Sequence, residues 1–399
     1  MVIQKQVNKS RNKKYIGIVL HSYPNNSETF FLNKFKCLND LGFRVTIFVD
    51  QKEDTGIANC INGFSWSGDR KNKVWQLIKA VVRLLGSPIK TVILLYRNSQ
   101  SGYKAFFNFV SVLRSSHIFG YDLDWLHFGF ATCALGRENL ASLIGAKMST
   151  SIRGYDIAIY PKLNLGCYKL LWKKLDKLHY ISDDLLNIAK KEGFNIQIKH
   201  KKIPPCIDTK FFSGHQRIEI SKPLKIITNA RLHWKKGYDY IFKALAILKQ
   251  NSVPFKYTII GEGDQFERLI YATHQLKIYE HICFVGIQSK KEVKSLLEEN
   301  DIFILYSIQE GFSNAVLEAQ SMGLLSIVSD SEGLNENVLN GISGWIIPKL
   351  SPSILAERLI SIFSLKSEIV KEMSNNAIQH VNQKHGLRQL KAGFKDFYR

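Results

Sequence analysis

The feature that most constrains the fold is a regular alternation of short β-branched runs with longer segments of helical periodicity. Such alternation predicts βαβ units built around parallel sheets. In the first half we expect strands at 15–20, 44–49, 91–96, 125–130 and 147–152. In the second half the pattern is more regular, with strands expected at 225–231, 256–261, 282–286, 302–307, 325–329 and 344–348. The sequence therefore predicts an α/β protein with parallel sheets.

The length of the chain predicts more than one domain. A chain of 399 residues exceeds what a single hydrophobic core commonly supports. Residues 204–223 contain prolines and polar side chains that interrupt the periodic pattern. We therefore place one Rossmann-like domain at 1–208 and a second at 222–380.

Positive charge is concentrated in the N-terminal half. The chain carries a net charge of +21, and residues 1–210 contain 32 Lys and Arg against 15 Asp and Glu. This excess predicts an anionic partner, which can be a phosphorylated substrate, an anionic membrane surface or nucleic acid. Nucleic acid is disfavoured because the charge is dispersed and no basic run alternates with exposed aromatic residues.

Other features of the composition indicate a cytoplasmic protein. No stretch approaches the ~20 apolar residues of a membrane-spanning helix, and the N-terminus lacks the apolar core of a secretory signal. The six cysteines are scattered, without a C-x-x-C pair or a Cys/His cluster. Zinc and disulfide frameworks are therefore disfavoured.

Two groups of residues in the second half follow predicted strands, where ligands of doubly wound sheets bind. Arg231 and Lys236 lie five residues apart in a strand-to-helix turn, and both could reach one diphosphate. The turn at 261–264 contains Gly261 and Gly263, which would let the backbone approach a ligand. Taken alone, the first group could be a solvated basic turn and the second a purely structural one.

A third group combines two glutamates with the start of a helix. Glu310 lies in the loop, Ser313 can cap the helix, and Glu318 lies in its second turn. The N–H groups expected to bind a phosphate or sugar hydroxyls belong to Gly311, Phe312, Ser313 and Asn314. The alternative is a capping loop beside a surface glutamate.

The E-x7-E pattern from Glu310 to Glu318, preceded by the Arg231 and Lys236 pair and by GEG, resembles glycosyltransferase family 4. That family consists of retaining, metal-independent enzymes of the GT-B fold, in which two Rossmann-like domains face a central cleft. The resemblance implies that Glu310 contacts the transferred sugar and that Glu318 holds the nucleotide ribose. One departure is Ala230, where relatives often have glycine.

The resemblance has two further implications. Arg231 and Lys236 would neutralise the leaving diphosphate, so the nucleotide-sugar donor would need neither a metal nor another cofactor. The tail, 381–399, would return to the N-terminal domain, as in GT-B relatives.

Segments of the N-terminal half resemble bacterial exopolysaccharide enzymes of the colanic-acid type. These are HSYPNNSETF (21–30), DWLHFGFATCALG (124–136) and SIRGYDI (151–157), which place Ser27, Glu28, Arg153 and Asp156 on the acceptor side. His127 is expected to face the cleft as a catalytic residue that hydrogen-bonds the sugar or the attacking hydroxyl; alternatively it is a core histidine. Arg153 stands where many relatives have histidine, which favours a fixed cation near a phosphate or an anionic sugar.

One helix of the N-terminal half has two interpretations. Residues 73–86 place Lys73, Gln76, Lys79 and Arg83 on one stripe, with apolar residues around the remainder. The segment is either a packed helix with one wet face or a basic amphipathic helix that rests on anionic lipid.

Together these features predict an enzyme that transfers a sugar from a nucleotide diphosphate sugar to a hydroxyl of a lipid-linked glycan destined for surface polysaccharide. The anomeric configuration would be retained by a front-face displacement. The enzyme would be cytoplasmic and peripheral on the inner face of the membrane. The alternative is a catalytically inactive sugar-nucleotide-binding protein of the same fold.

Overall fold

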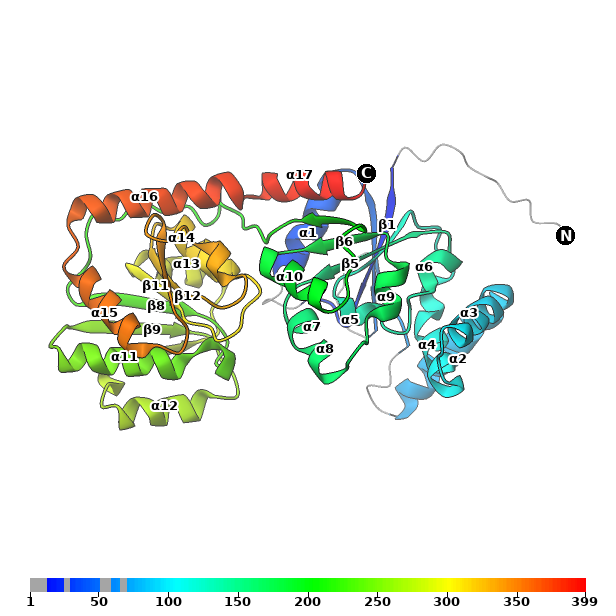
Figure 1. Cartoon of the computed structure of the whole chain (residues 1–399), viewed down its shortest axis with the longest axis horizontal. Coiled ribbons are helices and arrows are strands. Elements are labelled where there is room, and N and C mark those ends of the chain that lie inside the picture. Colours follow the sequence, from blue (N-terminus) through cyan, green and yellow to red (C-terminus); the bar gives the residue numbers. More distant parts are fainter. Residues whose placement is uncertain (1–12, 25–28, 51–58, 65–69) are drawn as a thin grey trace. The chain divides into compact units, whose positions relative to one another are not determined.

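The computed structural model describes residues 13–24, 29–50, 59–64 and 70–399. The chain forms two compact units, which are described separately (Figure 1). The N-terminal unit comprises Met1–Tyr180, Leu185–Ile203 and Lys391–Arg399, and the C-terminal unit comprises Ile181–Asp184 and Pro204–Leu390. The end of the chain therefore packs with the N-terminal unit.

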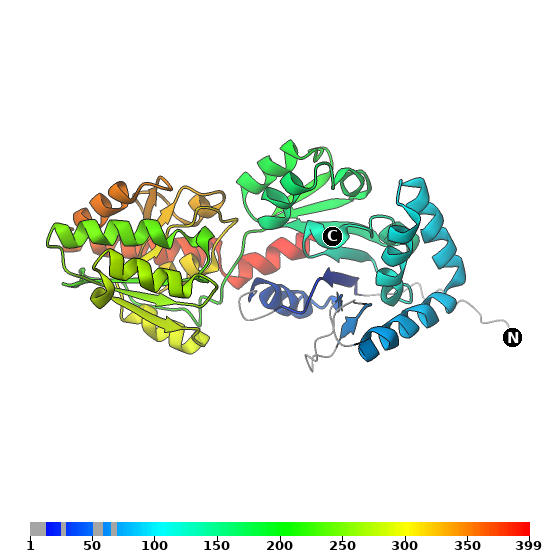
Figure 2. The same cartoon turned by 90° about the horizontal axis from the view of Figure 1, so that it is seen from below.

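The N-terminal unit is built on a seven-stranded parallel sheet with the order β3-β2-β1-β4-β5-β6-β7. Its strands are β1 (Tyr15–Leu20), β2 (Arg44–Val49), β3 (Cys60–Asn62), β4 (Trp125–Phe128), β5 (Lys147–Ile152), β6 (Lys177–Tyr180) and β7 (Lys199–Lys202). The helices between them are α1 (Thr29–Asp40), α2 (Arg70–Leu85), α3 (Pro88–Gln100), α4 (Ala105–Ser115), η1 (Ser116–Ile118), α5 (Ala131–Ala134), α6 (Leu140–Leu143), α7 (Tyr155–Ala158), α8 (Tyr160–Leu163), α9 (Lys169–Lys174) and α10 (Asp183–Lys191). Helices α2 and α3, coloured blue to cyan, lie together at the edge of this unit in both views (Figure 1 and Figure 2).

The C-terminal unit contains a six-stranded parallel sheet with the order β10-β9-β8-β11-β12-β13. Its strands are β8 (Leu224–Asn229), β9 (Phe255–Ile260), β10 (Ile282–Gly286), β11 (Ile302–Leu305), β12 (Leu325–Ser329) and β13 (Gly344–Ile347). Its helices are η2 (Trp234–Lys236), α11 (Tyr238–Gln250), α12 (Phe266–Gln275), η3 (Tyr279–His281), α13 (Lys290–Glu298), α14 (Asn314–Ser321), η4 (Leu334–Asn337), α15 (Pro352–Phe363) and α16 (Ser367–Lys384). The last helix, α17 (Leu387–Phe397), belongs to the N-terminal unit from Lys391 onward. In Figure 1, α11 and α12 cover one face of this sheet, whereas α14 and α16 cover the other.

Both sheets confirm the predicted α/β class with two Rossmann-like domains. In each sheet the chain starts at a central strand, builds outward on one side, and then returns to build on the other. The strand order therefore reverses between β1 and β4 in the first sheet and between β8 and β11 in the second. In open parallel sheets, ligands bind at such reversal points, beyond the carboxyl ends of the strands.

One predicted strand is a helix. Residues 91–96 belong to α3, where Pro88 takes the first turn and Leu94 and Asn98 are buried one turn apart. The β-branched run favoured a strand locally, but α3 packs against α4 and lies outside the sheet.

Three strands were not predicted. β3 has only three residues, and β6 and β7 read KLHY and KHKK, which lack an apolar run. Pairing with a neighbouring strand makes them strands, and the sequence pattern does not carry that information. No helix in the described ranges is both long and apolar enough to cross a membrane.

Candidate functional site

The predicted site residues of the C-terminal unit gather at the reversal point of its sheet. Lys236 closes the turn after β8, and Glu310 lies in the loop after the neighbouring strand, β11. Lys236 Nζ donates a hydrogen bond to Glu310 Oε2, and the two side chains are 18% and 19% exposed. The Ser307 hydroxyl lies 3.3 Å from the same carboxylate oxygen. A cation and a carboxylate are thus held side by side, half-buried, where the strand order predicts a ligand.

Arg231 adds a second cation to the same turn. Its side chain is exposed, and its charge acts on the neighbouring lysine, Lys235. Burial lowers the pKa of Lys235 and the charges of Arg231 and Lys236 lower it further, whereas Glu310 opposes the shift. Positive charge therefore accumulates around this turn.

Backbone contacts fix the two loops against each other. Ile308 N–H donates to the Lys235 carbonyl at 2.7 Å, which ties the loop after β11 to the turn after β8. Gly237 has φ +66°, and a Cβ there would lie 2.1 Å from the Tyr306 carbonyl oxygen. Only glycine allows both this conformation and this close approach.

The GEG turn supports the loop that carries Arg231. Gly261 has φ +132°, and a Cβ on it would lie 2.2 Å from the Ala230 carbonyl oxygen. A Cβ on Gly263 would lie 2.3 Å from the Leu232 carbonyl oxygen. Leu232 N–H donates to the Glu262 carbonyl at 2.9 Å. The packing of two strand-end turns therefore accounts for both glycines, and ligand contact by them stays a prediction.

The start of α14 differs in part from the prediction. Ser313 caps the helix as expected, because its hydroxyl accepts from Val316 N–H at 3.4 Å. The N–H of Ser313, however, donates to Asn337 Oδ1 at 3.0 Å, and the Asn337 amide donates back to the Ser313 carbonyl at 2.8 Å. The prediction that the Ser313 N–H binds a ligand is therefore wrong, because Asn337 uses it to hold the loop. The Phe312 side chain is buried, with its ring centroid 5.4 Å from that of His385.

Glu318 lies in the second turn of α14, partly buried. Burial raises its pKa to about 7, and the charge of Lys290 only partly offsets that rise. A carboxyl that titrates near neutral pH can change its hydrogen-bonding role within the physiological range.

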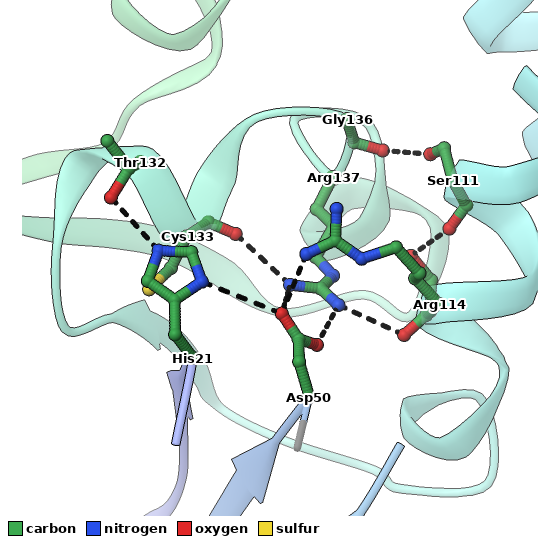
Figure 3. Close-up of polar contacts among 9 residues, drawn as sticks. His21, Asp50, Ser111, Arg114, Thr132, Cys133, Gly136 and Arg137 are labelled. Atoms are coloured by element: carbon green, nitrogen blue, oxygen red, sulfur yellow. Dashed lines mark hydrogen bonds and ion pairs between the residues drawn. The ribbon is translucent and has the colours of Figure 1, made fainter. Parts of the chain in front are cut away.

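A second polar cluster lies at the reversal point of the N-terminal sheet (Figure 3). His21 follows β1 and Asp50 follows β2, and His21 Nδ1 lies 3.7 Å from Asp50 Oδ2. His21 Nε2 lies 3.1 Å from the hydroxyl of Thr132, beyond β4. Arg114 donates to Asp50 at 2.7 Å, and Arg137, which is 1% exposed, donates to it from both terminal nitrogens. Three basic side chains thus surround one carboxylate.

Electrostatics keep this cluster cationic. The nearby Asp50 carboxylate raises the pKa of His21 to about 10, so the imidazole stays protonated at neutral pH. Burial favours the neutral form of Asp50, but the charge of Arg137, the contact with His21 and the charge of Arg114 hold its pKa well below the ordinary value. The side chains of His21 and Arg114 are 47% and 36% exposed, so these are the members that a ligand can reach.

The C-terminal site lies in a part of the chain that is similar to a known family. Residues 213–380 match the family model Glycosyl transferases group 1. The C-terminal unit is a glycosyl transferases group 1 domain. This range contains Arg231, Lys236, Glu310 and Glu318.

Full-length similarity extends beyond the glycosyl transferases group 1 domain. The chain is 28% identical over 401 residues to WcaL of Escherichia coli K12, named as a colanic acid biosynthesis glycosyltransferase, covering 94% of this chain and 98% of WcaL. A solved glycosyltransferase of Rickettsia africae superposes with a TM-score of 0.71 at 19% identity, covering 97% and 98% of the two chains. Anabaena HepE, solved in complex with UDP, superposes with a TM-score of 0.71 at 12% identity, covering 96% and 98%. The fold is therefore GT-B.

The predicted catalytic residue His127 lies outside the glycosyl transferases group 1 domain, and its side chain is buried in the core. It lies within β4 and is 0% exposed. Lys34 Nζ donates to His127 Nε2 at 2.8 Å, and the hydroxyls of Ser149 and Ser151 lie 2.8 Å from its two ring nitrogens. The rings of Phe397 and Tyr398 cover it at 5.9 and 5.8 Å. Burial lowers the pKa of His127 well below its ordinary value. The structure corrects the prediction in favour of a core histidine.

Asp156 also has a structural position. Asp156 is 3% exposed, and its carboxylate accepts hydrogen bonds from the N–H groups of Arg153, Gly154 and Ala131 at 3.0, 2.9 and 3.1 Å. These bonds join the loops after β4 and β5, so the predicted contact between Asp156 and the acceptor is wrong.

The other acceptor-side residues have different outcomes. The Arg153 guanidinium is partly buried over the Phe30 ring, 3.9 Å from its centroid, and its role as a cation for the acceptor stays a prediction. Ser27 and Glu28, both predicted on the acceptor side, lie outside the described residues. Sequence reasoning missed His21 and Asp50, although both directly follow predicted strands.

Proposed function

We propose that this protein transfers a sugar from a nucleotide diphosphate sugar to a hydroxyl of a glycan acceptor, with retention of anomeric configuration, in the synthesis of a surface polysaccharide. The observation that carries the proposal is the Lys236–Glu310 pair at the reversal point of the second sheet, beside the exposed Arg231. This arrangement offers cations to a diphosphate and a carboxylate to the sugar attached to it. The HepE structure, which contains UDP, supports a nucleotide donor, and the name of WcaL supports a polysaccharide product.

In the proposed mechanism, Arg231 and Lys236 act on the leaving group. The diphosphate gains negative charge as the glycosidic bond breaks, and fixed cations stabilise that charge more in the transition state than in the ground state. Glu310 would contact the sugar, whose anomeric carbon becomes positive. Retention would follow from a front-face displacement in which the departing phosphate assists the attacking hydroxyl.

The acceptor would be a lipid-linked glycan. The His21 cluster supports an anionic group there, because it presents a protonated imidazole backed by two arginines. A phosphate that links a glycan to its lipid has the matching charge. The enzyme would then work on the cytoplasmic side of the membrane.

The direct test is donor hydrolysis against a panel of UDP-, GDP- and ADP-sugars, with the released nucleoside diphosphate measured. Turnover of one donor class, with retained configuration in the product, would support the proposal. Binding of a donor without any turnover, with or without acceptor lipids, would instead favour the inactive sugar-nucleotide-binding alternative.

Activity is expected to survive excess EDTA. Arg231 and Lys236 supply the positive charge that a divalent ion supplies in metal-dependent enzymes. The measurement is the initial rate of donor turnover before and after chelation and after re-addition of Mg²⁺ or Mn²⁺. Complete loss of activity, restored by either ion, would contradict this part of the proposal.

The affinity for a nucleoside diphosphate is expected to rise as the pH increases through about 7. Burial raises the pKa of Glu318 to about 7, so the carboxylate that accepts hydrogen bonds from the ribose forms only above this pH. Calorimetry between pH 6 and 8 measures the effect, and Glu318→Gln is the matched control, because it keeps the titration of the ligand and removes that of Glu318. The same pH slope in both proteins would contradict the assignment.

Glu318 also predicts a trend in stability. A carboxyl whose pKa is raised in the folded state binds more protons there than in the unfolded chain. The free energy of unfolding should therefore fall as the pH rises from the ordinary Glu pKa, about 4.3, to about 7. Glu318→Gln should flatten this part of the profile.

A further inference from the structure

Helix α2 exposes its apolar face. Among its outward residues, Trp75, Val82 and Leu85 are 57%, 61% and 73% exposed. Their spacing of seven and three residues places them on one side of the helix. The opposite side, with Ala80 and Leu84, is buried. An ordinary surface helix exposes polar residues instead.

The basic stripe predicted for this helix is not its exposed face. Lys73, Gln76 and Arg83 are each partly buried, and Arg83 reaches back to the Asn62 carbonyl at 3.5 Å. Lys79 is exposed and lies over the Trp75 ring, 5.2 Å from its centroid. The face left open is apolar with cations at its border, so the interpretation as a packed helix with one wet face is wrong, and contact with anionic lipid stays a prediction.

The next two helices continue this surface. Ile89 of α3 is 75% exposed, and Phe106 and Phe107 of α4 are 77% and 63% exposed. The three helices pack against one another, and Figure 1 shows them grouped at the edge of the N-terminal unit. We call the outward apolar residues of α2, α3 and α4 the apolar helix surface. Several exposed aromatic and aliphatic residues on adjoining helices mark an interaction site more often than ordinary surface.

The charge of the segment indicates what covers this surface. Residues 70–115 contain nine Lys and Arg and no Asp or Glu. Lys71, Lys79 and Lys104 are exposed beside the apolar residues. A second copy of the chain would bring the same positive charge to the contact and be repelled. An anionic bilayer has the complementary properties, because it offers acyl chains to the apolar residues and negative headgroups to the lysines.

We propose that the apolar helix surface inserts into the interfacial region of an anionic membrane and anchors the protein there. Trp75, Phe106 and Phe107 enter the boundary between headgroups and acyl chains, and the neighbouring lysines contact lipid phosphates. The attachment is thus hydrophobic as well as electrostatic. It does not depend on sugar transfer.

The test is flotation of the full-length protein with vesicles of phosphatidylcholine alone or with added phosphatidylglycerol. We expect the protein to bind the anionic vesicles. High salt should weaken this binding in part, because it screens the lysines, and the apolar contact should leave a salt-resistant remainder. The triple variant Trp75→Ala/Phe106→Ala/Phe107→Ala should bind at least about tenfold more weakly, because it removes apolar area from the contact. Tyr271→Ala is the matched control, since Tyr271 is 66% exposed in the C-terminal unit; it should bind like the wild type.

Insertion itself has a separate readout. Brominated lipids should quench the fluorescence of Trp75, and Trp75→Phe should remove most of that quenching. Equal binding of the triple variant and the wild type, or no binding of the wild type to anionic vesicles, would overturn the proposal. The proposal would also be overturned if the wild type sedimented as a dimer and the triple variant as a monomer, while both bound vesicles equally. Hydrolysis of a soluble donor by the triple variant should be normal, which separates failure of this proposal from failure of the proposed function.

Discussion

Replacing Lys236 or Arg231 by alanine is expected to lower kcat/KM by about 10²–10³-fold while the protein stays folded. The reason is the change in charge on the diphosphate as the sugar leaves, which both cations would stabilise. Arg231 is exposed, so its removal disturbs no packing. Lys236 is half-buried against Glu310, so its removal leaves that carboxylate with the Ser307 hydroxyl as a remaining neighbour. The measurement is steady-state donor turnover, with thermal unfolding as the check on the fold.

A matched control separates a local effect from a change in net charge. Lys243 is exposed on α11, the helix that follows the same turn. Lys243→Ala removes one positive charge from the same unit and should leave kcat/KM unchanged. Near-normal turnover in both Arg231→Ala and Lys236→Ala, or an equal loss in Lys243→Ala, would remove the two cations from the mechanism.

The C-terminal site could be predicted because its signals are local. Arg231 and Glu310 each follow an apolar strand within a few residues, and parallel strands bring their carboxyl ends to one edge of the sheet. The Ser313 cap could be predicted for the same reason, since a cap is a contact within one turn. The use of the Ser313 N–H by Asn337 could not, because Asn337 lies 24 residues further along the chain.

The N-terminal half was harder to predict because packing decides its details. The sequence predicts that His127 faces the cleft after a strand, but Lys34 of α1 and the end of the chain enclose it within β4. Residues 91–96 have the composition of a strand and form part of α3. The His21–Asp50 contact joins the ends of two strands. The residues around either strand end alone do not indicate such a pair. For His127 and for the His21–Asp50 pair, the deciding contact connects segments far apart in the sequence.

Changing each of the two glutamates of the C-terminal site to glutamine is expected to impair a different step of the reaction. Glu310→Gln should lose mainly kcat, because a contact with the developing positive charge on the sugar is made in the transition state. Glu318→Gln should mainly weaken the binding of donor and free nucleoside diphosphate alike, because a contact with the ribose is equally strong in the ground state and in the transition state. The variants keep the size and shape of the side chains, so both proteins should fold normally.

The ion pair between Lys236 and Glu310 makes this test sharper. In the structure Glu310 holds the Lys236 ammonium, so the carboxylate competes with a diphosphate for the same cation. Glu310→Gln removes the competing charge, and the variant should therefore bind a nucleoside diphosphate as tightly as the wild type or more tightly, even though it turns over slowly. Calorimetry with the nucleoside diphosphate isolates this effect, because that ligand carries no sugar for Glu310 to contact. Weaker binding in Glu310→Gln, to the same extent as in Glu318→Gln, would mean that both carboxylates hold the nucleotide and that the catalytic contact with the sugar comes from elsewhere.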